Sequence, residues 1–352
     1  MQTRVLRKIH MSIFMFKNIS QKFNNFSPRD LSYFLVIWGV ALIALLYFPI
    51  QEVFAGQWQL YQKVDLFNLP TIEILGNTIP IGVVSVRYYS LCILVGVICG
   101  YLLTLYLAAR HFVVASVIDR MLVGLVVFGL AGARLFYVSF NWEQFQNNLP
   151  NIIFGLSQGG LAIFGAVIVG IIYLIAYVSQ YKFNFFEFID FLTPGLLLGQ
   201  ILGRWGNWFN YESYGPATSV LWKMYVPIEA NVSDNLNSRF FHPTFLYEIL
   251  ANYLLLIFIL YKYDGLTRKN AGLVGGYYCV GYGTIRFFCE FFRLDALKFD
   301  LGRNINVFGY FSFQYLAVSQ LMACILFIFG LIILAKRSRV IYLKKNMSEV
   351  RI

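Results

Sequence analysis

The sequence has little charge and no polar region long enough to form a soluble domain. Only 13% of its 352 residues are charged, whereas 59% are hydrophobic. Apolar runs of about 20 residues recur, which is the length that a helix needs to cross a bilayer. Because the backbone in lipid must satisfy its own hydrogen bonds, these runs must be helices. The composition therefore indicates a polytopic helical membrane protein.

Cysteine is also scarce, and its positions exclude a common use. The five cysteines all lie in apolar segments and none in a loop: Cys92, Cys99, Cys279, Cys289 and Cys324. This arrangement fits neither a disulfide framework nor a zinc site. The glycine-rich segment 159–165 lacks a phosphate-loop lysine and does not follow a strand, which excludes a nucleotide loop. We expect no metal and no cofactor.

The net charge of +11 would suggest nucleic acid as a partner for a soluble protein. Here much of the basic excess flanks the apolar runs, as membrane topology requires. We therefore expect the lipid bilayer as a partner and no nucleic acid.

The hydrophobic pattern predicts an all-α polytopic bundle of about eight transmembrane helices. The runs lie near 32–50, 84–108, 117–138, 160–180, 185–203, 244–261, 273–292 and 311–335. The basic residues between runs fall on one side, and the 141–157 loop on the other side has neither Lys nor Arg. This asymmetry places both ends of the chain in the cytoplasm. The first run lies too far from the amino terminus for an ordinary signal peptide.

The same pattern divides the chain into four regions. Residues 1–31 form a basic cytoplasmic segment, 32–80 an additional transmembrane helix with an outer loop, 81–335 the main membrane domain and 336–352 a basic cytoplasmic tail. The longest outer loop, 204–243, is expected to form a small extracytoplasmic head, because structureless loops of that length are uncommon.

A cluster of polar residues follows the apolar run that ends at Leu202. Between positions 203 and 215 the sequence places Arg204, Asn207, Asn210 and Glu212 among aromatic residues and glycines. Anchoring at the interface would need only a few Lys or Trp residues. The glycines at 203, 206 and 215 suggest close backbone approach or special turns. We interpret the stretch as a polar site at membrane depth.

The seventh run carries a second polar feature. Its members share one helical face at intervals of four, four and three residues: Tyr282, Arg286, Glu290 and Arg293. Charged groups facing lipid cost at least a few kcal/mol each, so this face should point into the bundle or a watery cavity. The alternative is an Arg286–Glu290 ion pair that only ties helices together.

Four more residues have both a functional and a structural interpretation. Arg134 could bind a ligand or simply snorkel to the interface. Tyr89 could belong to the aromatic belt, and His242 could be a structural interface residue. Thr244 is expected to cap the helix that begins there.

Several arginines thus converge near one side of the membrane: Arg134, Arg204, Arg286 and Arg293. Guanidinium forks match phosphate oxygens. A buried arginine cluster with few acids implies an anionic ligand, and the abundant anion in lipid is a phospholipid headgroup.

Five motifs, which occur along the chain in matching order, resemble those of the prolipoprotein diacylglyceryl transferase family. They are the 203–215 stretch, the 242–248 segment, the 282–293 face, the 159–165 segment and the tyrosine at 89, and the similarity runs from about residue 80 to 335. The resemblance implies an enzyme of the bacterial cytoplasmic membrane, with its active site toward the outer leaflet. It implies transfer of diacylglyceryl from phosphatidylglycerol to the lipobox cysteine of a prolipoprotein, with release of glycerol phosphate.

The resemblance also assigns roles to residues. Arg204, Asn207 and Gly215 match signature positions, and Arg204 matches the phosphatidylglycerol contact. We expect Arg204, Arg286, Glu290 and Tyr89 in catalysis. The residues expected to bind substrate are Arg204, Asn207, Asn210, Glu212, Gly215, Arg134, Tyr282, Arg293 and His242.

Two departures from the family pattern bear on these roles. Phe164 stands where some members carry a histidine proposed to assist catalysis, and phenylalanine cannot move a proton. The family is usually described with seven spans, so the 32–50 run would be an addition. Glu290 is a candidate base, although Arg286 beside it should weaken it, and Glu212 is the competing candidate. A transporter of an anionic solute and a non-catalytic lipid-binding protein are the alternative functions.

Overall fold

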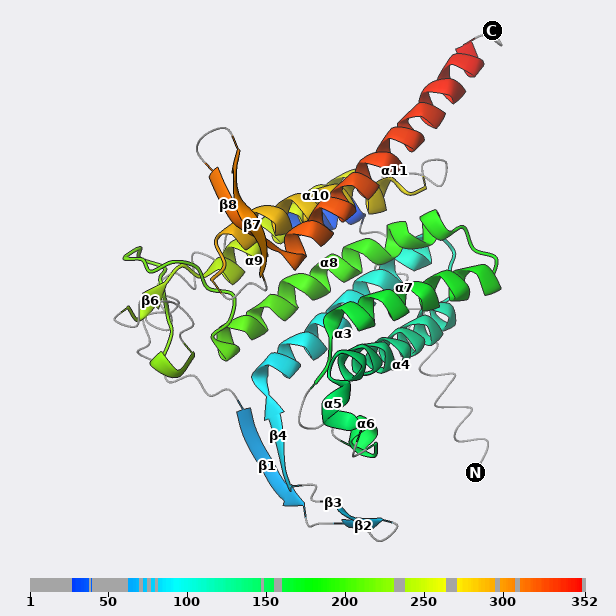
Figure 1. Cartoon of the computed structure of the whole chain (residues 1–352). Coiled ribbons are helices and arrows are strands. Elements are labelled where there is room, and N and C mark those ends of the chain that lie inside the picture. The colour runs from blue at the N-terminus through cyan, green and yellow to red at the C-terminus, as the bar shows by residue number, and fades with distance from the viewer. Residues whose placement is uncertain are drawn as a thin grey trace, which may run out of the picture. The chain divides into compact units, whose positions relative to one another are not determined.

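The structure is a computed structural model that describes most of the chain beyond residue 81 (Figure 1). The described ranges are 27–37, 39, 63–69, 72–74, 77–79, 82–146, 149–154, 160–230, 238–263, 271–294, 298–307 and 311–349. The chain divides into a first unit of residues 1–103 and 193–352 and a second unit of residues 104–192. Each unit is described by itself below.

Helices make up the fold, as the sequence predicts. The long ones are α3 (Tyr88–Arg110), α4 (Ala115–Phe140), α7 (Ile163–Gln180), α8 (Phe185–Asn210), α9 (Thr244–Tyr263), α10 (Leu273–Phe291) and α11 (Val318–Glu349). Within the described residues, six of these seven helices are long and apolar enough to cross a membrane. The seventh, α10, does not meet the same criterion. The all-α polytopic prediction is confirmed.

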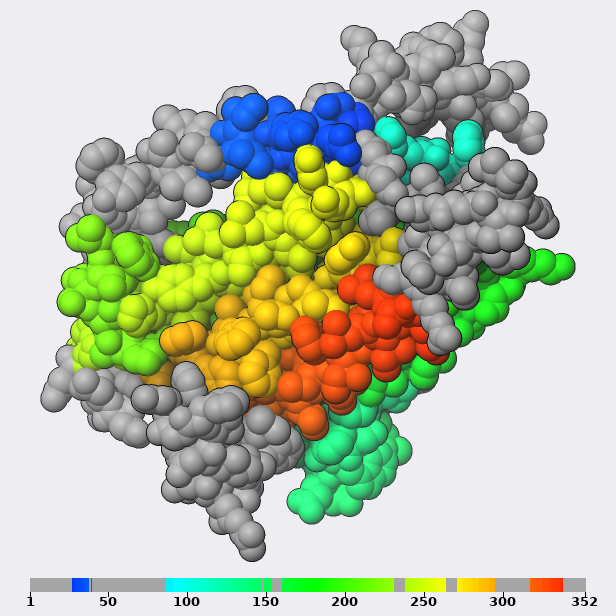
Figure 2. Space-filling model, turned by 90° about the horizontal axis from the view of Figure 1, so that it is seen from above, coloured from blue at the N-terminus to red at the C-terminus, as the bar shows by residue number. Residues whose placement is uncertain are grey.

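The predicted first span, 32–50, lies largely outside the described residues. Its described part, together with a few preceding residues, is helical from 28 to 37 and at 39. This segment packs along α9: the Tyr253 hydroxyl donates to the Leu35 carbonyl at 2.6 Å, and the rings of Tyr33 and Tyr261 meet edge to face. Figure 2 shows the two elements side by side, with the segment in blue and α9 in yellow.

Two predicted boundaries are wrong. The helix of the fifth run was expected to end at 203, but α8 continues to Asn210, so Arg204 and Asn207 lie on a helix and not in a loop. The last span was expected from 311, but residues 311–317 form a strand and α11 begins at Val318. In the first place Arg204 pairs with Glu248 on α9, and in the second the residues pair with the neighbouring strand 298–307. Local composition reports neither pairing.

Short antiparallel strand pairs join the helices. They are β1 (Lys63–Leu69) with β4 (Gly82–Arg87), β2 (Ile72–Ile74) with β3 (Asn77–Ile79), β5 (Met224–Tyr225) with β6 (Phe240–Phe241), and β7 (Lys298–Val307) with β8 (Phe311–Ala317). The pair β5–β6 lies within the predicted head, together with a single 3-10 turn at Ile228–Ala230.

Glycines let helices of the first unit approach closely. A Cβ added at Gly96 on α3 would lie 2.8 Å from the backbone oxygen of Gly199 on α8. A Cβ added at Gly283 on α10 would lie 2.8 Å from the backbone oxygen of Ala323 on α11. Small residues at such contacts are the usual basis of helix packing in membranes, where hydrophobic burial between helices supplies little driving force.

The second unit is built on α4 and α7, with the short helices α5 (Trp142–Phe145) and α6 (Asn151–Phe154) between them. Gly132 on α4 faces Gly165 on α7, and a Cβ at Gly132 would lie 2.6 Å from the Gly165 carbonyl oxygen. The buried Tyr177 hydroxyl donates to the Val117 carbonyl at 2.7 Å. This bond joins the last turns of α7 to the first turn of α4.

Candidate active site

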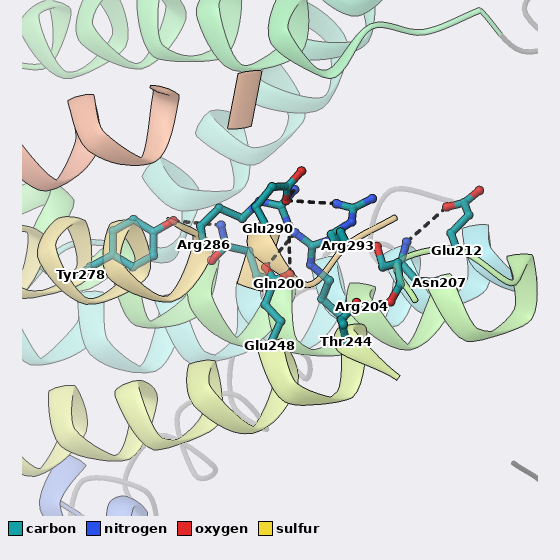
Figure 3. Close-up of polar contacts among 11 residues, drawn as sticks. Gln200, Arg204, Asn207, Glu212, Thr244, Glu248, Tyr278, Arg286, Glu290 and Arg293 are labelled. Atoms are coloured by element: carbon teal, nitrogen blue, oxygen red, sulfur yellow. Dashed lines mark hydrogen bonds and ion pairs between the residues drawn. The ribbon is translucent and has the colours of Figure 1, made fainter. Parts of the chain in front are cut away.

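Three helices of the first unit bring five charged side chains together in a row of alternating sign (Figure 3). We call this row the arginine–glutamate cluster; its members are Arg204 on α8, Glu248 on α9, Arg286 and Glu290 on α10, and Arg293 just beyond α10. The row is assembled from positions that are up to 89 residues apart in the sequence, so it is a product of the tertiary fold.

Glu248 is the central link of the cluster. Its Oε1 lies 2.8 Å from Arg204 Nη2, and its Oε2 lies 3.0 Å from Arg286 Nη1. Each carboxylate oxygen thus faces a different guanidinium. On the other side, Arg286 Nη2 lies 2.8 Å from Glu290 Oε2, which also lies 3.5 Å from Arg293 Nη1.

The cluster is largely enclosed, and its five described members together carry one excess positive charge. Glu248 is 1% exposed and Glu290 is 4% exposed, so both carboxylates depend on their arginine partners for neutralisation. In the ion pairs between described residues of the cluster, three guanidinium groups meet two carboxylates. A partly enclosed site with an unbalanced positive charge is suited to an anion.

The contacts in the cluster leave hydrogen-bonding capacity unused. Arg286 Nη1 donates a hydrogen bond to Glu248 Oε2, whereas Glu248 Oε1 and Glu290 Oε2 accept none from the described part of the chain. Those two oxygens therefore meet their arginines at ion-pair distance without hydrogen-bond alignment. A phosphate could engage guanidinium N–H groups without first breaking an aligned hydrogen bond to either oxygen.

Two tyrosines border Arg204. Tyr282 on α10 contacts Arg204 through its hydroxyl, and its ring stacks on Tyr278 with the ring centroids 5.4 Å apart. Tyr89, at the start of α3, interacts electrostatically with both Arg204 and Glu212. The predicted tyrosines at 89 and 282 therefore both lie beside the arginine that the sequence placed at the centre of the site.

The end of α8 is shaped by one glycine and by an amide–carboxylate contact. A Cβ at Gly206 would lie 2.5 Å from Tyr89 Cδ2, so only glycine lets the tyrosine ring lie against this helix. The Asn207 and Asn210 amides donate to opposite oxygens of Glu212, at 3.2 and 3.1 Å. These two bonds fix the exposed Glu212 carboxylate at the helix end.

The turn after α8 lies against the start of α9 and the end of α10. The Thr244 hydroxyl donates to the Ser213 carbonyl at 2.6 Å, and the Gly215 N–H donates to the His242 carbonyl at 2.8 Å. The positive φ angles fall on Tyr211 and Ser213, each at 55°, and not on the glycine. A Cβ at Gly215 would lie 2.7 Å from the Phe292 carbonyl oxygen, so this glycine permits close approach.

With the geometry described, comparison with known proteins decides the family. A sequence profile described as prolipoprotein diacylglyceryl transferase matches residues 77–336. The chain belongs to the prolipoprotein diacylglyceryl transferase family. A protein of Thermosynechococcus vestitus named phosphatidylglycerol–prolipoprotein diacylglyceryl transferase is 34% identical over 222 residues, which cover 63% of this chain and 82% of the relative. A Gloeobacter violaceus protein of the same name is 38% identical over 220 residues, which cover 62% of this chain and 81% of the relative.

Among the residues expected to act in this transferase-family protein, Arg134 lies in the second unit. Its guanidinium donates to the carbonyls of Ile152, Asn151 and Gly160 at 2.8, 2.7 and 3.0 Å, and it lies over the Phe145 ring. These contacts hold the connection between α4 and α7 in place. A part for Arg134 in binding phosphate remains a prediction.

His242 makes contacts outside the cluster. Its Nδ1 lies 2.8 Å from the Tyr247 hydroxyl, which also accepts a hydrogen bond from Trp222 Nε1 at 2.9 Å. These contacts link the head to the first turn of α9, as expected of an interface residue. Thr244 is the first residue of α9, and its hydroxyl donates to the Ser213 carbonyl. That it also caps the helix remains a prediction.

The sequence analysis did not single out Glu248 as a site residue. It lies one turn into α9, where an acidic residue is common because it complements the helix dipole. The signal that could have found it is the cost of a carboxylate within a transmembrane helix, which usually marks function. Phe164 lies in the first turn of α7, in the second unit, where it offers no group that exchanges a proton.

Proposed function

We propose that this protein transfers the diacylglyceryl group of phosphatidylglycerol to the lipobox cysteine of a prolipoprotein, the first step of lipoprotein maturation. Family membership and the names of the relatives support the reaction. The observation that carries the residue assignment is the buried arginine–glutamate cluster with its excess positive charge.

The reaction sets one main task for the protein. The cysteine sulfur attacks the glycerol carbon that bears the phosphate, a carbon–sulfur bond forms and the carbon–oxygen bond breaks. The electron pair leaves with glycerol phosphate, and the thiol proton passes to a base. A thiol with a pKa of about 8.5 loses its proton at modest cost. Stabilising the charge on the departing phosphate is therefore the larger need.

Arg204 and Arg286 are the phosphate ligands in this proposal. Glu248 positions both, because its two oxygens hold the two guanidinium groups 2.8 and 3.0 Å away on either side. Fixed arginines need no reorganisation when charge develops, which is the basis of electrostatic preorganisation. Tyr89 and Tyr282, which border Arg204, are placed to contact the lipid or the incoming peptide.

Glu212 is the better candidate for the base. Glu290 is buried between Arg286 and Arg293, and its carboxylate is engaged in ion pairs with both. Glu212 is exposed and is held by two neutral amides. Its place at the end of α8 leaves it open to an incoming peptide.

The orientation follows from the positions of basic residues. Arg110 ends α3, Lys262 lies in the last turn of α9 and Arg337 lies far along α11. The cluster lies at the opposite end of α9. By the positive-inside rule the cluster lies toward the outer leaflet of the bacterial cytoplasmic membrane.

The test uses purified protein, phosphatidylglycerol and a lipobox peptide, with the peptide mass as the measurement. We expect a mass gain of one diacylglyceryl group on the peptide and none on a Cys→Ser peptide. Arg204→Ala should abolish the gain while the protein still inserts and purifies. Near-normal thioether formation by that variant would contradict the role of Arg204 as a phosphate ligand. Uptake of a solute by the reconstituted protein without lipid turnover would favour a transporter.

A further inference from the structure

A second polar layer lies one helical turn from the arginine–glutamate cluster. Gln200 precedes Arg204 by four residues on α8, and Asn252 follows Glu248 by four residues on α9. Because α8 ends near the cluster and α9 begins there, both steps lead away from it, by about 6 Å along each helix. The Gln200 amide donates to the Tyr278 hydroxyl of α10 at 2.9 Å (Figure 3). We call Gln200, Asn252 and Tyr278 the amide layer.

The amide layer is poor in hydrogen bonds. Asn252 is 0% exposed, and neither its Nδ2 nor its Oδ1 has a hydrogen-bond partner among the described residues. Gln200 Oε1 is also buried, and no described residue gives it a hydrogen bond. An unsatisfied buried polar group costs about 1–3 kcal/mol. Groups of this kind within a transmembrane bundle usually serve a ligand.

We propose that the amide layer binds the ester carbonyls of the diacylglyceryl group. This inference rests on the proposed function. Two carbonyl oxygens follow the phosphate of phosphatidylglycerol within a few bonds, and esters accept hydrogen bonds without donating any. An amide side chain can turn to present its N–H groups, and a tyrosine hydroxyl can donate. The layer therefore offers donors on the side of the cluster where the esters would lie.

This arrangement would hold the reacting carbon from two sides. The carbon attacked by sulfur lies between the phosphate and the ester-bearing part of glycerol. With phosphate on Arg204 and an ester on Gln200 or Asn252, the carbon–oxygen bond that breaks is fixed in direction. Fixing a reacting bond in an attack geometry is a large source of rate acceleration.

The two amides differ in how a lipid reaches them. Gln200 is partly exposed, so an ester can approach it directly, whereas Asn252 is enclosed and meets an ester only after neighbouring side chains shift. On binding, Asn252 would gain a hydrogen bond that the lipid-free protein does not give it. A residue that only ties helices together would instead be expected to have its partner already.

The test compares phosphatidylglycerol with its diether analogue, which lacks both carbonyls, in the mass assay of thioether formation. We expect the wild-type protein to favour the diester in kcat/KM by roughly threefold to tenfold for each hydrogen bond lost. Asn252→Leu should lower that ratio by the roughly threefold to tenfold that one hydrogen bond contributes. It should also raise the thermal midpoint in lipid-free detergent, since it removes an unpartnered amide. Gln200→Met should lower the ratio too. Thr284→Val is the control, because the Thr284 hydroxyl donates to the Val280 carbonyl of its own helix.

Three results would overturn the inference. These are equal wild-type rates with the two lipids, an unchanged ratio in Asn252→Leu, and a ratio lowered as much by Thr284→Val. If a variant does not fold, the wild-type ratio still decides. If the wild-type protein formed no thioether with either lipid, the proposed function itself would be wrong. This result differs from the three above, which concern the amide layer alone.

Discussion

At the scale of single residues, Glu248 organises the site by facing two arginines at once. Without it, Arg204 and Arg286 would repel each other, and neither would have a fixed direction. Carboxylate and phosphate are both matched by guanidinium forks. Glu248 therefore places two arginines near each other in the lipid-free protein, where they can receive the substrate.

Glu248→Gln should lower both stability and transfer. The substitution keeps the shape of the side chain but leaves two arginines without their shared carboxylate, and breaking a buried pair costs up to about 3–5 kcal/mol. We expect a lower thermal midpoint and a loss in kcat/KM of roughly a hundredfold or more. Glu229→Gln, at an exposed position of the head, is the control and should change neither quantity. Wild-type transfer by Glu248→Gln would contradict the positioning role.

Arg286→Lys should be severe, although it keeps the charge. Arg286 reaches Glu248 with Nη1 and Glu290 with Nη2, and the single ammonium of lysine cannot serve both at these distances. We expect a large fall in thioether formation, measured by peptide mass. Arg293→Lys is the matched comparison, because Arg293 meets Glu290 at the longer distance of 3.5 Å. The fall in thioether formation should be smaller in that variant. Equal losses in the two variants would speak against a bidentate role.

At the scale of elements, the end of α8 shows what sequence can and cannot predict. The polar stretch was recognised from its composition, and the face of α10 from its spacing. The helix was nevertheless expected to end at 203, because glycine, asparagine and aromatic residues are typical of a loop. The helix continues because Arg204 meets Glu248 and Gly206 meets Tyr89, and both partners are distant in sequence. Local pattern therefore predicted the chemistry of the stretch better than its backbone.

Gly206→Ala tests that close approach. The added methyl would lie 2.5 Å from Tyr89 Cδ2 and 3.2 Å from Tyr89 Cα, so the start of α3 would have to move. We expect transfer to fall at least tenfold. Gly203→Ala on the same helix is the matched control, since its Cβ would meet nothing within 4 Å. Alanine there should preserve transfer and stabilise the helix by up to about 1 kcal/mol. If both variants transferred equally well, contact with Tyr89 would have no part in activity.

At the scale of the whole molecule, the order of the long helices was predictable, whereas the short strands and the partners of the helices were not. Apolar length and basic flanks predicted the transmembrane helices, because both follow from the bilayer itself. The strand pair 298–307 with 311–317 was not predicted. The strand 311–317 leads directly into α11, and the hydrophobic pattern does not separate the two elements. The family match begins at residue 77, close to the predicted start of the membrane domain at 81. The division into four regions remains a prediction.

Removal of residues 1–50 should separate stability from transfer. The family match lies entirely beyond this segment, so the transferase domain should fold and act without it. Residues 28–37 nevertheless run along α9 through Tyr253 and Tyr261, and α9 carries Glu248. We expect thioether formation per molecule within about twofold of the full chain and a lower thermal midpoint, because hydrogen bonds between membrane helices contribute about 0.6 kcal/mol each. Tyr253→Phe, which deletes only the hydrogen bond to Leu35, should give a smaller shift in the same direction. Complete loss of transfer in a truncated protein that still folds would mean that the additional helix belongs to the catalytic unit.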